Sequence, residues 1–143
     1  QHIYTEIGHV SAETALSGGG LPRLYRAICA VDGHEAVLET PEAITAAGLA
    51  GDPIALEVLD QFSIWLGRVA GNNVLTTGGR GGGYIVGGVI PRFADFFIKS
   101  GFAKSFCDKG CMSDYFKGIP VWLVTAPYSG LTGAGVALEQ AFA

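Results

Sequence analysis

The stretch DPIALEVLDQFSIWLGRVAGNNVLTTGGRGGGYIVGG, residues 52–88, contains the change of hydrophobic period that decides the fold. In its first part apolar residues recur every three or four positions, which predicts a long helix over 53–77 with one buried face. The pair Asp52-Pro53 is a typical helix start, and Gly78-Gly79 is a typical helix end. In its second part, GYIVG at 83–87 is a short apolar run bounded by glycines, which predicts a buried β-strand.

The rest of the chain adds mainly helices and one more strand. A second apolar run, IPVWLVT at 119–125, predicts another buried strand. The further expected elements are a short turn capped by Ser11 and ended by Gly18, helices over 22–31, from Thr40-Pro41 and over 91–99, and a closing helix over 131–143. Two strands among five or six helices form an α/β layer that is too small for a whole sheet. We therefore expect the missing strands to come from an absent N-terminal part.

Composition limits the classes of function. Of 143 residues 49% are hydrophobic and only 15% are charged, against a usual charged share of about 25%, so much of the surface should be covered by the chain itself or by a partner. The net charge of −4, without a basic patch, argues against nucleic-acid binding, which needs phosphate neutralisation. No apolar run reaches the roughly 18 residues of a membrane helix. The chain opens on Gln1 inside an expected helix, so we expect a segment of a longer protein.

Three cysteines, an odd number, occur without a secretory signal, which predicts reduced thiols in the cytoplasm. They are Cys29, Cys107 and Cys111. Cys107 and Cys111 have no histidine nearby, and two ligands are too few for a zinc site. We therefore predict plain thiols and no metal site.

Two glycine motifs are candidates for a nucleotide site. Gly87-Gly88 follows a strand and precedes a helix, an order that lets a flat ring lie against bare backbone but also suits a tight packing turn. SGLTGAG at 129–135 is a glycine turn before a helix, which fits either phosphate at the helix N-terminus or close packing of two helices. The glycines at 78–83 precede the strand, so they do not match the dinucleotide-binding order of strand, glycines and helix.

Glu13, in the N-terminal part of the sequence, is a further candidate for a ligand-binding residue. It lies in GHVSAETALSGGGL, residues 8–21, among small and apolar residues and just before three glycines. Composition alone favours a solvated carboxylate that interacts with a helix N-terminus. The alternative is a ligand held where the glycines let something approach the backbone closely. No Ser-His-Asp arrangement can be placed, and His9 has no visible partner.

Four segments together resemble the C-terminal half of bacterial ATP-dependent glucokinases, a family of the actin-like sugar kinase superfamily. They are IGHVSAETALSGGGLPRLYRAI at 7–28, GRVAGNNVLTTGGRGGGYIVGGVIPRF at 67–93, SGFAKSFCDKGCMSDYF at 100–116 and IPVWLVTAPYSGLTGAG at 119–135. They keep the family's order and cover most of the chain. The weakest stretch is 32–51.

The resemblance implies a fold and a site. The fold would be α/β, an incomplete actin-like (ribonuclease H-like) ATPase lobe, with 1–143 the large-lobe portion of a two-lobed sugar kinase whose N-terminal lobe is absent. It implies ATP-dependent transfer of the γ-phosphoryl group to the 6-hydroxyl of D-glucose, with ATP and Mg²⁺, and we also expect a cytoplasmic homodimer. Glu13 would bind sugar hydroxyls. The residues implied on the nucleotide side are Gly87, Gly88, Ser129, Gly130 and Gly133.

Several family motifs are absent from this sequence. They are the D-x-G-G-T phosphate loop, the N-D pair whose Asp is the general base, the G-x-G-T-G-x-G loop and the E-G-G-H sugar motif. We therefore predict no catalytic base and no metal ligand in this chain, and no phosphorylation of glucose by the chain alone. The alternatives are a kinase for another hexose, a sugar- or nucleotide-binding module without chemistry, and a remnant with no function of its own.

Overall fold

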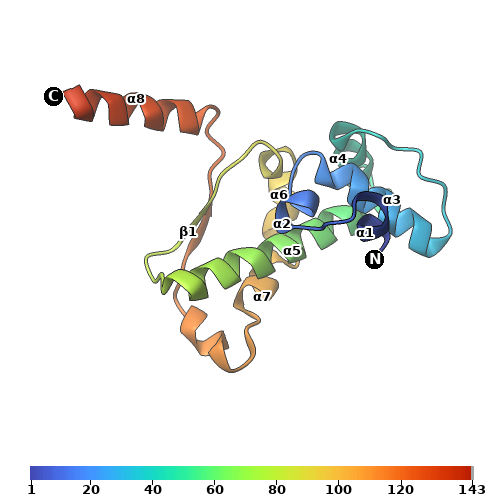
Figure 1. Ribbon diagram of the computed structural model, residues 1–143, viewed down its shortest axis with the longest axis horizontal. Helices are drawn as coiled ribbons and strands as arrows, with labels where there is room; N and C mark the ends of the chain where they lie inside the picture. The colour runs from blue at the N-terminus through green and yellow to red at the C-terminus, as the bar shows by residue number, and fades with distance from the viewer. Residues whose placement is uncertain (143) are drawn as a thin grey trace.

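The computed structural model describes residues 1–142 and is mostly helical (Figure 1). The helices of the N-terminal half are α1 (His2–Ile7), α2 (Ala12–Ala15), α3 (Gly20–Asp32), α4 (Pro41–Leu49) and α5 (Pro53–Thr77). They are followed by β1 (Gly83–Ile85), the 3₁₀ helix η1 (Ile90–Phe93), α6 (Ala94–Lys99), α7 (Phe102–Cys107), the 3₁₀ helix η2 (Gly110–Phe116), β2 (Val121–Leu123) and α8 (Ser129–Phe142). No helix within 1–142 is both long and apolar enough to cross a bilayer.

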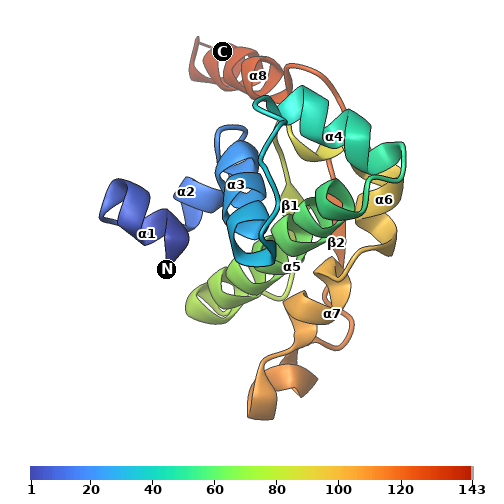
Figure 2. The same cartoon turned by 90° about the vertical axis from the view of Figure 1, so that its right-hand side faces the viewer.

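The long helix α5 is the centre of the structure, and α3, α4 and α7 pack against it (Figures 1 and 2). Its start and end agree with the prediction, since the Asp52 carboxylate accepts a hydrogen bond from Ala55 N at 2.8 Å and Gly78 forms the C-cap. Its fully buried face carries Val58, Leu59 and Phe62. The core continues through phenylalanines of η1, α6, α7 and η2, which are Phe93, Phe97, Phe102, Phe106 and Phe116.

The two strands pair in parallel with Gly83 opposite Val121 and Ile85 opposite Leu123. The prediction of two strands is confirmed, but both are shorter than expected and neither is buried. Tyr84 and Trp122 stack on one face of the pair, with ring centroids 4.8 Å apart, and are 67% and 43% exposed. These exposed fractions show that this face of the strand pair is not covered by other residues of 1–142.

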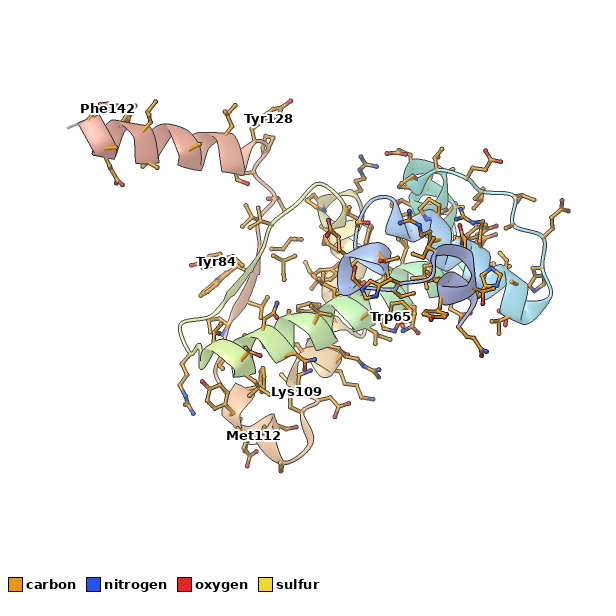
Figure 3. The ribbon with its side chains drawn as sticks, in the orientation of Figure 1. Trp65, Tyr84, Lys109, Met112, Tyr128 and Phe142 are labelled. Atoms are coloured by element: carbon orange, nitrogen blue, oxygen red, sulfur yellow. The ribbon has the colours of Figure 1, made fainter. Side chains whose placement is uncertain are left out.

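The helix α8 extends away from the other helices (Figure 1), and none of its described residues is buried. Figure 3 labels Tyr128 and Phe142 at its two ends, and their side chains are 80% and 84% exposed. The helix starts at Ser129, two residues before the predicted start. Ala143, the last residue of the predicted helix, lies outside the described residues.

Two other helix predictions need correction. The helix expected to begin at Pro22 begins at Gly20, because Gly20 N donates to Ser17 O and Ser17 Oγ and so closes the first turn earlier. The helix expected over 91–99 is divided into η1 and α6 at Phe93, whose φ of −137° is not helical. Burial of the Phe93 side chain against Phe62 accompanies this break.

Candidate functional site

The parallel pairing brings both nucleotide-side candidates to one edge of the sheet. Val124 N donates to Ile85 O at 2.9 Å, so the pairing extends to the carboxyl ends of both strands. Gly87-Gly88 follows β1 at this edge, and the exposed linker 125–128 follows β2 there. In open α/β sheets ligands bind beyond the carboxyl ends of parallel strands, so this edge is the candidate site.

The turn at Gly87-Gly88 is exposed to solvent, and core residues follow it in the chain. Gly87 has φ +152°, a conformation that side-chain-bearing residues rarely adopt. No atom lies within 4 Å of a Cβ built at either glycine, and both residues are exposed. Directly after the turn, Ile90 and Phe93 are buried in the core. The turn therefore presents bare backbone to solvent from a fixed position.

Gly18, the first of the three glycines that follow Glu13, lies beside this turn. A Cβ built at Gly18 would have Val89 Cγ2 as its nearest neighbour, at 3.9 Å, so the Val89 side chain lies close to Gly18. Val89 comes directly after Gly87-Gly88. The structure thus brings together two segments that are some 70 residues apart in the sequence, counted from Gly18 to Gly88.

Glu13 lies on α2, a single helical turn in front of α3. Its side chain is exposed, and within 1–142 it makes no hydrogen bond and no ion pair. A reciprocal capping box fixes the start of this turn, because Ser11 N donates to Thr14 Oγ1 and Thr14 N donates to Ser11 Oγ. The carboxylate is therefore available to accept hydrogen bonds from a ligand.

Gly20 and Arg23 hold α2 in place, a role that the sequence did not indicate for either residue. A Cβ at Gly20 would lie 2.2 Å from the Ala15 carbonyl oxygen, so only glycine permits this approach of α3 to α2. Arg23 Nη1 donates to Thr14 O at 3.4 Å. Nothing in the sequence distinguishes Gly20 from its two neighbouring glycines, because the contact depends on how α3 folds back. At Gly20 the close approach is to protein backbone.

The segment 129–135 is helical, so its interpretation as a turn was wrong. The turn before α8 is at Pro127-Tyr128, and Ser129 and Gly130 form the N-terminus of the helix. Gly133 lies in the next helical turn. No described atom outside the helix backbone lies within 4 Å of a Cβ at Gly130 or Gly133, so no second helix packs closely there within this chain.

The described residues contain no group of three or more His, Cys, Asp and Glu side chains that could hold a metal ion. Cys29 is buried, Cys107 and Cys111 are exposed, and all three are free thiols.

The mostly helical fold with its parallel strand pair defines a class of protein: part of a lobe of an actin-like ATPase. Comparison with known proteins narrows the class. The family model described as Glucokinase matches residues 1–141. The chain belongs to the glucokinase family.

Individual relatives agree with this assignment. The chain is 51% identical over 142 residues to a glucokinase of Pseudomonas aeruginosa (strain LESB58), and 48% identical over 136 residues to one of Saccharophagus degradans. These alignments cover 99% and 94% of this chain but 43% and 42% of those relatives. The crystal structure of a glucokinase from an Antarctic psychrotroph superposes with a TM-score of 0.88 at 37% identity, over 97% of this chain and 44% of that one. The chain thus spans less than half the length of the relatives it matches.

Proposed function

We propose that this chain is the large-lobe part of a glucokinase that transfers the γ-phosphoryl group of ATP to the 6-hydroxyl of D-glucose. The observation that carries the proposal is the contact between the segment after Glu13 and the turn after β1. Gly18 and Val89 adjoin each other, so a sugar at Glu13 and a nucleotide at Gly87-Gly88 would lie on neighbouring parts of one surface. A kinase needs this arrangement, since phosphoryl transfer depends mainly on positioning the two substrates.

In this proposal Glu13 binds and orients the sugar. An ionised carboxylate accepts hydrogen bonds from two neighbouring hydroxyl groups, and such charge-assisted bonds are stronger than neutral ones. A site built in this way also rejects analogues that lack those hydroxyls. The exposed position of Glu13, without a competing partner in residues 1–142, supports this role.

The nucleotide side combines the turn at Gly87-Gly88 with the start of α8. The exposed glycines offer a flat, unobstructed surface for adenosine. Ser129 and Gly130 present backbone N–H groups at the N-terminus of a 14-residue helix, and such a terminus favours an anion. Gly133 would keep the next turn of this helix free of side chains toward the nucleotide.

The remaining parts of the reaction belong to chain that this sequence lacks. The base that takes the proton of the 6-hydroxyl and the loops that hold the phosphates lie among the absent motifs. The family implies Mg²⁺, but the residues present do not fit it, since 1–142 hold no group of metal-ligating side chains. ATP is the second substrate.

The proposal extends to the whole molecule. The other lobe of the kinase would cover the Tyr84–Trp122 face and α8, the two surfaces left exposed here. We place the kinase in the cytoplasm, in keeping with its three free thiols. We also propose that it is a homodimer. Sedimentation of the full-length protein would measure its oligomeric state.

The test is a coupled phosphorylation assay on the full-length kinase with Glu13→Gln and a panel of hexoses. Glutamine keeps the shape of the side chain but loses the charge, so kcat/KM for glucose should fall about ten- to hundredfold while KM for ATP stays near native. Glu39→Gln is the matched control, because Glu39 is also exposed. Turnover of another hexose in preference to glucose would mean that this hexose, and not glucose, is the substrate. Absence of turnover with every hexose would favour a binding module without chemistry.

A further inference from the structure

The position of Glu13 depends on how α2 is held. A four-residue helix is far too short to be stable by itself. Since the Glu13 side chain makes no hydrogen bond or ion pair within 1–142, no such bond besides those of the α2 backbone fixes the place from which its carboxylate extends. Whatever fixes α2 therefore also fixes the proposed sugar ligand.

One hydrogen bond connects α2 with the rest of the described chain. The capping box links Ser11 and Thr14, which are both within this turn, and Leu16 N donates to Ala12 O. The bond from outside is donated by Arg23 Nη1 to the carbonyl oxygen of Thr14. It is also the sole hydrogen bond of the Arg23 side chain within 1–142.

The chemistry of this contact suits an arginine. The carbonyl of Thr14 is in the last turn of α2 and has no partner in the helix. The C-terminal end of a helix carries partial negative charge, so a cation is favourable there. Arg23 reaches it from the first turn of α3, where its side chain is half-buried. The planar guanidinium loses less freedom on forming such a bond than a lysine would.

We propose that Arg23 is a positioning residue for sugar binding: it holds α2 at Thr14 so that the Glu13 carboxylate meets the sugar hydroxyls. Arg23 itself does not touch the sugar. This inference rests on the proposed function, because it requires that Glu13 binds the sugar.

Arg26 provides a matched control on the same helix. It lies three residues further along α3 and has the same charge and length. Its guanidinium pairs with Glu6 of α1 at 2.8 Å, and both side chains are about 40% exposed, at 42% and 39%. Arg26 thus makes an exposed contact to α1 and no hydrogen bond to α2, so its loss should leave Glu13 in place.

The experiment measures steady-state kinetics of the full-length kinase carrying R23M or R26M. We expect R23M to raise KM for glucose about three- to tenfold, with KM for ATP and kcat near native, because one hydrogen bond to a charged group is lost on the sugar side. R26M should change none of these values by more than about twofold. R23K keeps a cationic donor and should retain most of the glucose affinity, whereas R23Q, which is shorter and uncharged, should not.

A double mutant separates positioning from general destabilisation. If Arg23 acts through Glu13, R23M should have little further effect on KM for glucose in the E13Q background. The full effect of R23M in that background would overturn the inference. So would equal increases in KM for glucose and ATP, or kinetics of R23M that match those of R26M. Should R23M not fold, the contrast between R23K and R23Q decides the same question.

The outcomes also distinguish this inference from the proposed function. Loss of glucose use in E13Q together with native kinetics in R23M rejects only the role of Arg23. Native kinetics in E13Q itself reject the sugar-binding role on which the inference rests.

Discussion

At Gly20 the absence of a side chain determines how closely two helices approach. The first turn of α3 passes over the C-terminal end of α2, and a Cβ at Gly20 would lie 2.2 Å from Ala15 O and 2.4 Å from Ala15 C. Both neighbours are backbone atoms, so neither can rotate away. Gly19, one residue earlier, has φ −71° and no atom within 4 Å of its Cβ position.

This difference predicts opposite outcomes for two adjacent substitutions. Gly20→Ala should destabilise the full-length kinase by about 1–3 kcal/mol, because it forces α2 and α3 apart, and it should raise KM for glucose because Glu13 moves with α2. Gly19→Ala should change stability by less than about 0.5 kcal/mol. Urea unfolding and glucose kinetics measure both effects. Equal stability of the two variants would mean that the contact between α2 and α3 relaxes without cost.

The candidate residues were predicted with unequal success. Glu13 and Gly87-Gly88 could be found from the sequence because a family motif surrounds each of them, and their roles in binding stay predictions. Gly20 and Arg23 could not be found in this way. Their importance arises from a contact between α2 and α3, and no local pattern specifies which glycine or which arginine makes it.

At the scale of elements, an ion pair joins α4 to η1. Arg92 of η1 donates to the Glu42 carboxylate in the first turn of α4. The hydrogen bond from Arg92 holds the pKa of Glu42 below its usual value of 4.5. Because η1 follows the turn at Gly87-Gly88, this exposed ion pair connects the segment after the turn to α4.

The lowered pKa predicts a pH-dependent contribution to stability. A carboxylate with a lowered pKa in the folded state stabilises it above the unfolded pKa, near 4.5, and loses this effect as the pH falls through the folded value. The native kinase should therefore have a slightly higher Tm than Glu42→Gln near pH 7, and the difference should vanish in acid. Thermal unfolding of both proteins from pH 7 to pH 3 measures it, with Glu39→Gln as control. A difference that does not vary with pH would exclude the ion pair as its cause.

Elements with local start and stop signals were predicted best. The bounds of α5 are confirmed because Asp52, Pro53 and Gly78 act within one turn of the helix ends. By contrast, α7 and η2 were not predicted. Their positions depend on distant contacts, such as Phe102 and Phe106 of α7 in the core beside α5, and Tyr115 of η2 under the guanidinium of Arg80.

At the scale of the whole molecule, the chain leaves two apolar surfaces uncovered. One is the sheet face with Tyr84 and Trp122, and the other is α8, with Leu131 and Leu138 at 74% and 61% exposure. The apolar composition indicated that a partner surface exists, but the sequence could not locate it. The prediction of buried strands was wrong because burial of a strand requires elements packed over both faces of its sheet, and within 1–142 the face with Tyr84 and Trp122 is exposed.

The absence of several family motifs from this sequence leads to a prediction about activity. The chain by itself should not phosphorylate glucose, because it lacks the N-D pair and the phosphate loops. A coupled assay should detect turnover by the full-length kinase and none by the purified chain at the same molar concentration. Omission of ATP is the control for the coupling system. Turnover by the chain, at a level that rises with its purity, would overturn this prediction.

The pairing of β1 with β2 also constrains the order in which the chain folds. Between the two strands lie η1, α6, α7 and η2, so the pairing closes a long loop that is costly in entropy until those elements have formed. Of these helices α7 instead packs extensively on α5, the helix that precedes β1 in the chain, and α6 also contacts α5. A growing polypeptide would therefore assemble its helices on α5 first and complete the sheet only after β2 has left the ribosome. The carboxyl edge of the sheet, and with it the candidate site, forms last.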